Sequence, residues 1–225
     1  MNYPQERTEA FERYYRQGFP SIFTQSHADA LDNLLRLDRM LWEFGADGGV
    51  SEIGVLDGGF FIAMHNLMLR GCISLAIDVF DLADYQLDPA GIGFGRAQLP
   101  RFRANLAAWA IRPWAVVLVE QDSMTITPMQ RVELLHTIGF VKFFSIDGNH
   151  TEAQTWNDLE IAGALTAIDG IIIVDDYPNG AWPGVKTATS RWLIEHEWMP
   201  LLEDTNKLYL AHRTMHEAYK AALGR

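Results

Sequence analysis

The sequence predicts an α/β protein built on a doubly wound, mostly parallel sheet. Short apolar runs alternate along the chain with amphipathic segments of helical length, and such alternation is typical of a parallel sheet. The run 170–174 (GIIIV) is apolar at consecutive positions, which indicates a strand covered by helices on both faces. Together these two observations favour a doubly wound sheet.

The elements follow in chain order. Residues 4–44 are helical in pattern, with apolar side chains at three- and four-residue spacing from Ala30 until Gly45 ends the run, so residues 1–45 are expected to form a helical cap. Thr151 and Gln154 have the spacing of a capping box. Strands are expected at residues 50–56, 73–80, 115–119, 141–146 and 170–174, and helices at 60–70, 97–110, 128–138, 152–167 and 184–197.

The carboxyl-terminal part and the length complete the architecture. Residues 199–212 hold two short strand-like runs around Asp204 and Asn206, which predicts an antiparallel hairpin at the sheet edge. The glycine-rich stretch 89–95 is expected to be a surface loop over a site. A chain of 225 residues fits a single domain over residues 1–225, because α/β folds often reach about 250 residues as one unit.

Composition narrows the range of partners. Hydrophobic residues make up 48% of the chain, enough for a substantial core, and 18 basic against 29 acidic residues give a net charge of −11. Such a surface repels nucleic acids and anionic membranes, so we expect neither as a partner. The single Cys72 excludes an intrachain disulfide framework. No signal peptide or membrane span is evident, and we expect a cytoplasmic protein.

The turn after the first strand is a candidate ligand site. It contains Glu52, Gly54, Asp57 and Gly58, and glycines at such a turn let a ligand approach the backbone, although they also suit a plain tight turn. Acidic side chains disfavour a dinucleotide pyrophosphate and favour a cationic ligand such as S-adenosylmethionine. Asp78, after the second strand, is placed to hold ribose hydroxyls, or has only a structural role. The triplet Gln121, Asp122 and Ser123 follows the third strand and is placed to bracket the adenine.

A second constellation carries the expected chemistry. Asp147 follows the fourth strand, and Asp175 and Asp176 follow the fifth, so the three carboxylates are expected to converge where neighbouring strands end. Three oxygen ligands without thiolates suit a hard ion such as Mg²⁺. His150 lies three residues after Asp147, and its ordinary pKa near 6.5 suits a general base. Each aspartate taken alone also suits a turn or a helix cap.

Several motifs together resemble a known family. They are VSEIGVLDGG, AIDVFD, QDS, SIDGNH, the following NDLE, and IIIVDDY with WPGVKTA. These resemble class I S-adenosylmethionine-dependent methyltransferases, and most of all the macrocin-type, metal-dependent sugar O-methyltransferases, over residues 47–212. The pairing of D-G-x-H with D-D-Y is the most specific part. The resemblance implies a Rossmann-like core over 47–212, Mg²⁺ ligation by Asp147, Asp175 and Asp176, and deprotonation of the acceptor hydroxyl by His150.

Two positions depart from that family pattern. Leu56 stands where many methyltransferases carry another glycine, and Asn149 stands where relatives commonly carry a second aspartate. The leading hypothesis is an S-adenosylmethionine-dependent O-methyltransferase acting on a small-molecule hydroxyl, such as that of a sugar. A non-catalytic S-adenosylmethionine-binding regulatory module and a nicotinamide-dependent oxidoreductase stay open as alternatives, as does a homo-oligomer. Acceptor-pocket walls are expected from residues 1–45, 81–95 and 177–183, with Tyr177 and Trp182 as flat surfaces, although Trp182 equally suits packing at the start of the next helix beside Pro183.

Overall fold

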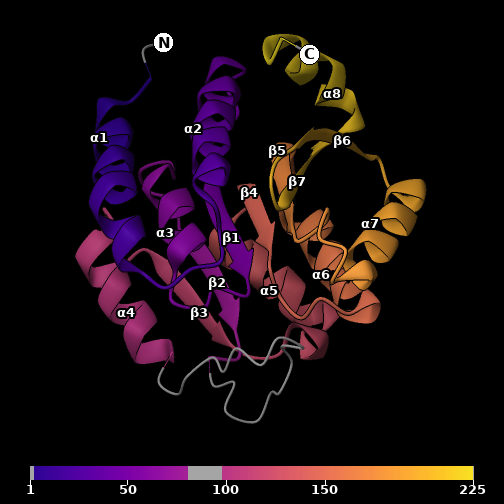
Figure 1. The fold of residues 1–225 in the computed structure, drawn as a ribbon, viewed down its shortest axis with the longest axis horizontal. Coiled ribbons are helices and arrows are strands. Elements are labelled where there is room, and N and C mark those ends of the chain that lie inside the picture. Colours follow the sequence, from indigo (N-terminus) through magenta and orange to yellow (C-terminus); the bar gives the residue numbers. More distant parts are fainter. Residues whose placement is uncertain (1–2, 81–97, 225) are drawn as a thin grey trace.

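The structure is a computed structural model that describes residues 3–80 and 98–224 (Figure 1). The expected surface loop at 89–95 and the expected pocket wall at 81–95 lie outside the described residues. The strands are β1 (Gly49–Ile53), β2 (Ser74–Asp78), β3 (Val116–Glu120), β4 (Val141–Ile146), β5 (Thr166–Asp175), β6 (Trp198–Glu203) and β7 (Lys207–His212). The α-helices are α1 (Gln5–Arg13), α2 (Ala28–Glu43), α3 (Gly59–Asn66), α4 (Gln98–Trp109), α5 (Pro128–Ile138), α6 (Glu152–Leu165), α7 (Pro183–Glu195) and α8 (Arg213–Ala222).

Within residues 3–80 and 98–224 the strands form one seven-stranded sheet in the order β3-β2-β1-β4-β5-β7-β6. Strands β1 to β5 pair in parallel, whereas β7 is antiparallel to β5 and β6 is antiparallel to β7. This confirms the predicted mostly parallel sheet with an antiparallel hairpin at its edge. The strand order reverses direction between β1 and β4, and doubly wound folds bind ligands beyond the carboxyl ends of strands at such a switch point.

Helices cover both faces of the sheet, as the run GIIIV predicts (Figure 1). Ile171 and Ile173 pack into a core shared with α2, α3, α4 and α8, whereas Ile172 and Val174 pack into a second core shared with α5, α6 and α7. All four side chains are fully buried, because successive residues of a strand point to opposite faces. None of the helices in the described ranges is long and apolar enough to cross a membrane.

The amino-terminal region differs from the predicted pattern. After α1 the chain forms a π-helical turn at Tyr14–Gly18 and a 3-10 turn at Phe19–Ser21, and residues 22–27 are not helical. A helical pattern across all of residues 4–44 is therefore wrong, since the apolar periodicity starts only at Ala30, inside α2. The Tyr14 hydroxyl donates to the carbonyl of Gly59 at 2.6 Å, which ties this region to the start of α3.

Local signals define some element boundaries and miss others. Thr151 does cap α6, because its hydroxyl accepts the backbone N–H of Gln154 at 3.3 Å, but the Gln154 side chain turns to Ser123 instead of completing a capping box. A complete capping box is formed by Thr127 and Gln130 at the start of α5. The sequence patterns did not predict α8, which follows the edge hairpin directly.

Candidate functional site

A cavity of about 1380 Å³ opens beyond the carboxyl ends of the parallel strands. The ends of β1, β2, β4 and β5 contribute to its wall, as do residues 23–27 and the loop before α7. Residues at the ends of strands that are far apart in the sequence therefore line the same cavity. The sequence-predicted residues that line it are Glu52, Gly54, Asp78, Gln121, Asp122, Ser123, Asp147, His150, Asp175 and Asp176.

Gly58 is the predicted site residue that lies elsewhere. It precedes α3 with a φ of +92°, and its backbone N–H donates to the carbonyl of Val55 at 2.7 Å. A side chain at this position would meet the Phe102 ring at 3.0 Å and Ile62 at 3.1 Å. Gly58 therefore forms a tight turn outside the cavity lining, and its contact with the cofactor stays a prediction.

Gly54 joins the ends of β1 and β4. Its φ is +82°, which ends β1 earlier than the predicted 50–56, and a Cβ here would lie 1.8 Å from the carbonyl oxygen of Asp147. In return, the Asp147 backbone N–H donates to the carbonyl of Ile53 at 2.8 Å. Only glycine permits this approach, which places Asp147 beside the β1 turn.

Gly54→Ala is expected to lower the free energy of unfolding by more than about 3 kcal/mol, because it combines left-handed strain with a backbone clash. The matched control is Gly71→Ala. Gly71 has a similar φ of +93° but open space around its missing side chain, so it should lose only about 1 kcal/mol. Urea unfolding of both variants measures the difference, and equal losses would contradict this role of Gly54.

Asp78 organises the β1 turn as well as facing the cavity. One carboxylate oxygen accepts the backbone N–H of Leu56 at 2.9 Å, and the other accepts that of Phe80 at 2.8 Å. Leu56 has a φ of +50°, the left-handed backbone that glycine favours, so the position suits the glycine that the resembled family pattern has there. Burial raises the pKa of Asp78 despite these hydrogen bonds. Asp78 thus has the structural role considered above while lining the predicted ribose region.

The 121–123 turn is held by its own network. The buried Ser123 hydroxyl donates to Asp158 at 2.6 Å, and Asp122 accepts the backbone N–H of Met124 at 2.9 Å. Gln121 donates to the Thr125 hydroxyl at 2.7 Å. These hydrogen bonds hold the turn against α6, at the wall of the cavity. The turn is therefore a fixed part of the cavity wall, and its contact with adenine stays a prediction.

Acidic side chains and His150 meet at the ends of β4 and β5. The His150 Nε2 atom lies 3.5 Å from Asp147 Oδ1 and 3.3 Å from Asp176 Oδ2. Ligand atoms of Asp147, His150 and Asp175 all lie within 4.8 Å of one another, close enough to hold one metal ion. The imidazole stacks on Trp182, with ring centroids 4.9 Å apart. Tyr177 and Trp182 both pack against the core beside β5, but of these two expected flat surfaces only Trp182 lines the cavity.

Mutual charge shifts the pKa values in this cluster. Burial disfavours the charged imidazole, but the adjacent Asp147 and Asp176 raise the pKa of His150 above its ordinary 6.5. Burial and the charge of Asp147 raise the pKa of Asp175 well above its ordinary 3.8. Burial acts likewise on Asp147, but His150 and Lys207 outweigh it and lower the pKa of Asp147. Without an added cation, the imidazole therefore keeps its proton to higher pH than a free histidine.

Glu52 adds a further acid beneath the same region. It is 2% exposed, and burial together with the charge of Asp147 raises its pKa well above the ordinary value. Ionising such a group becomes easier when a positive charge approaches it. The cavity is thus electrostatically suited to cationic ligands, as its acidic residues predict.

Solved structures of methyltransferases match the fold of this chain. The O-methyltransferase NovP matches with a TM-score of 0.67 at 18% identity, over 84% of this chain and 81% of that one. CalS11, described as a TDP-rhamnose 3′-O-methyltransferase of calicheamicin biosynthesis, matches with a TM-score of 0.58 at 18% identity, over 94% and 96%. The chain has a methyltransferase fold. TomG of Streptomyces achromogenes, solved with S-adenosylmethionine, matches at 0.55 and 12% identity, over 94% and 91%.

Comparison by sequence was negative. No protein-family model matches the chain, and a search of curated proteins gave no match. The structural matches therefore establish the Rossmann-like methyltransferase fold that the motifs predict.

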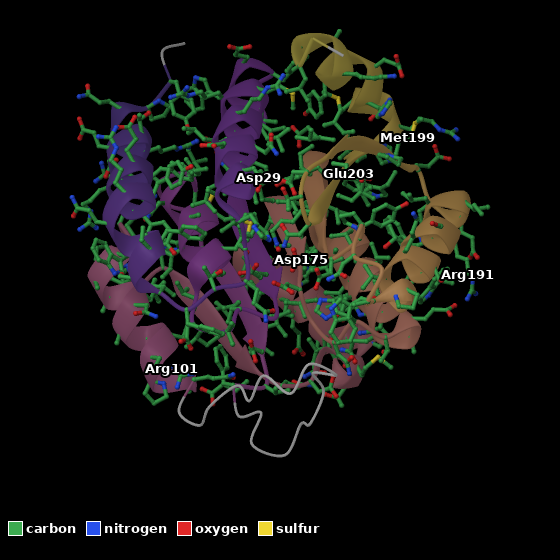
Figure 2. The ribbon with its side chains drawn as sticks, viewed as in Figure 1. Asp29, Arg101, Asp175, Arg191, Met199 and Glu203 are labelled. Carbon is green, nitrogen blue, oxygen red and sulfur yellow. The ribbon has the colours of Figure 1, made fainter. Side chains whose placement is uncertain are left out.

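The motifs missed part of the site. Residues 23–27 line the cavity and fall within the wall expected from residues 1–45, but no expectation covered Thr205 and Asn206 in the turn of the edge hairpin, which line it as well. Lys207, completely buried, forms an ion pair with Asp175 at 2.5 Å. Figure 2 shows Asp175 in the interior of the molecule, far from peripheral side chains such as Arg191. A lysine within an apolar strand was the one available signal, but nothing in the sequence identifies its partner.

Proposed function

We propose that the protein is an S-adenosylmethionine-dependent O-methyltransferase acting on a hydroxyl of a small molecule, a sugar or sugar-containing metabolite. One observation carries the proposal. The cofactor-type turns of β1, β2 and β3 and the cluster of His150 with three aspartates line the same cavity, in a fold shared with O-methyltransferases. Donor and acceptor can therefore be held side by side, which removes much of the entropic cost of a bimolecular reaction.

S-adenosylmethionine is assigned to the side formed by Glu52, Gly54, Asp78 and the 121–123 turn. Its sulfonium and ammonium groups complement the acidic side chains there, whereas a dinucleotide pyrophosphate would be repelled. Calorimetry should find one site per chain for S-adenosylmethionine and none for NAD. NAD binding without S-adenosylmethionine binding would favour the oxidoreductase alternative.

Asp78→Ala is expected to weaken S-adenosylmethionine binding by about 1–3 kcal/mol, since it leaves ligand and turn hydrogen-bonding groups unpaired. Calorimetric titration of both proteins measures the change. Asp78→Asn keeps one side-chain oxygen as an acceptor and should lose less. Thermal unfolding of each variant separates a loosened turn from a lost ribose contact, and an unchanged affinity in Asp78→Ala would rule out the contact.

The acceptor side is assigned to His150 and the neighbouring carboxylates. Asp147, Asp175 and Asp176 would hold Mg²⁺. Asp147 and Asp175 belong with His150 to the group of close ligand atoms, and Asp176, outside that group, lies 3.3 Å from the His150 Nε2 atom. A bound Mg²⁺ would supply positive charge that makes an acceptor hydroxyl more acidic. His150 takes the hydroxyl proton on its Nε2 atom, and Trp182 fixes the plane of the imidazole by stacking.

The assignment of a sugar-type acceptor draws on the wall of the cavity. Trp182 offers a flat surface there, and residues 23–27 (FTQSH) bring hydrogen-bonding side chains from the amino-terminal region. Aromatic faces and neutral polar groups suit a polyhydroxylated ring. Among the matched structures, CalS11 is described as acting on TDP-rhamnose.

Turnover distinguishes an enzyme from a regulatory module. Asn149, which motivated that alternative, lines the same cavity. Transfer of labelled methyl from S-adenosylmethionine to a panel of glycosides, with Mg²⁺ present, tests the enzyme proposal directly. Binding of S-adenosylmethionine without transfer to any hydroxyl acceptor would favour the module. A cytoplasmic location, a homo-oligomer and the absence of nucleic-acid and membrane partners stay predictions.

A further inference from the structure

Lys207 is a buried cation directly behind the proposed metal site. It lies opposite Asp175 in the antiparallel pairing of β7 with β5, and its Nζ atom is 2.5 Å from Asp175 Oδ1. The side chain is completely buried, and its Nζ atom lies 4.4 Å from the centroid of the Phe60 ring. Because an unpaired buried ammonium is costly, Lys207 holds this ion pair firmly.

The same oxygen of Asp175 receives a second donor. The side-chain amide of Asn206 donates to Asp175 Oδ1 at 2.8 Å. The backbone N–H groups of Asn206 and Lys207 both donate to Asp204 Oδ1, at 3.2 and 2.8 Å, so the hairpin turn fixes both donors. Oδ2 is therefore the Asp175 oxygen that can coordinate a metal without displacing a donor.

We propose that Lys207 controls the divalent-cation site, by restricting Asp175 to one coordinating oxygen and by weakening the binding of every cation through its charge. This rests on the metal site of the proposed function. Ca²⁺ takes six to eight oxygens and readily uses both oxygens of a carboxylate, whereas Mg²⁺ needs an octahedral shell with single oxygens and water. A one-oxygen Asp175 thus favours Mg²⁺ over Ca²⁺.

The surrounding charges support this role. Besides Asp175, its ion-pair partner at 2.5 Å, the acids whose charges act on Lys207 are Asp147 and Glu52. One positive charge thus offsets part of the negative charge that would otherwise attract a metal. Removing it should strengthen the binding of any divalent cation.

The test is calorimetric titration of MgCl₂ and of CaCl₂ into the full chain, without substrate. In Lys207→Met we expect Ca²⁺ affinity to rise about tenfold or more and to rise more than Mg²⁺ affinity. Lys207→Arg keeps the charge and the donors, and should retain the original preference. The matched control is Lys142→Met, which removes another buried lysine, paired with Asp47 at 2.8 Å at the opposite end of the sheet. It should change stability but neither metal affinity.

Circular dichroism and thermal unfolding establish that each variant is folded. If Lys207→Met does not fold, Asn206→Ala becomes the test variant. It removes one of the two donors to Asp175 Oδ1 and should therefore raise the affinity for Ca²⁺ relative to that for Mg²⁺. Unchanged affinities in the folded variant, or an equal effect in Lys142→Met, overturn the proposal. If no protein binds either metal, the proposal and the Mg²⁺ assignment both fail, whereas S-adenosylmethionine titrated in the same way still tests the methyl donor.

Discussion

His150→Ala is expected to lower kcat for methyl transfer by about 10²–10⁴-fold, the usual contribution of a positioned general base. An alcohol is a poor nucleophile until its proton is removed, and the His150 imidazole is the neutral-pH base placed among the carboxylates of the cavity. S-adenosylmethionine affinity should remain, because His150 lies on the acceptor side. Steady-state kinetics with saturating Mg²⁺ and calorimetry of the methyl donor provide the two measurements.

Two other roles for His150 compete with that of general base. A helix cap is the first, but the structure gives that role to Thr151, whose hydroxyl accepts the Gln154 backbone N–H. Metal ligation is the second, because His150 belongs to the group of close ligand atoms. A ligand role predicts that His150→Ala raises the Mg²⁺ concentration needed and that saturating Mg²⁺ restores kcat. Restored or near-normal kcat would remove the base assignment and leave the methyltransferase proposal in place.

The pH dependence of His150 follows from the same geometry. The neighbouring carboxylates raise its pKa above 6.5, so in metal-free protein the fraction of neutral base grows only as pH rises through that higher value. A nearby Mg²⁺ repels the imidazolium and should shift the titration back to lower pH. NMR titration of the histidine ring with EDTA and then with Mg²⁺ measures both directions, and an imidazole that titrates alike in the two conditions contradicts its placement beside the metal.

Removal of divalent metal is expected to abolish methyl transfer, and addition of Mg²⁺ should restore it. Acidic side chains are gathered at the ends of β4 and β5, where a hard cation would offset their repulsion. Asp176→Asn should raise the Mg²⁺ concentration required for half-maximal rate, because it removes a charge from the site. Asp175→Asn should do the same, but it also removes the partner of the buried Lys207, which makes Asp176→Asn the cleaner variant.

The control for the metal experiment is Asp47→Asn. Asp47 pairs with Lys142 at 2.8 Å, away from the cavity, so its loss should reduce stability without changing the Mg²⁺ requirement. Full activity in EDTA would show that the enzyme works without a divalent ion. That result would direct attention to Lys207, whose charge already offsets part of the acidic cluster.

The sequence by itself determined the layers of the fold and the ends of its central strands. Ile171 to Val174 are apolar at every position, a run typical of a strand covered on both faces, and the alternation of such runs with helical segments made the doubly wound sheet predictable. Asp147, Asp175 and Asp176 each follow a strand, and parallel strands end at one edge. Local patterns therefore sufficed to bring these residues and His150 together.

Only the tertiary structure decided what depends on register and on close backbone approach. The sequence suggested that Gly54 lets a ligand approach the backbone. In the structure, the absence of a side chain at Gly54 makes room for the backbone carbonyl of Asp147, which is far away in the sequence. Lys207 faces Asp175 because β7 inserts between β5 and β6 in one particular register. A wall from residues 1–45 was expected, but only the structure shows that residues 23–27 are the part that lines the cavity. Such contacts depend on pairings across the folded chain, which hydrophobic periodicity and local motifs do not encode.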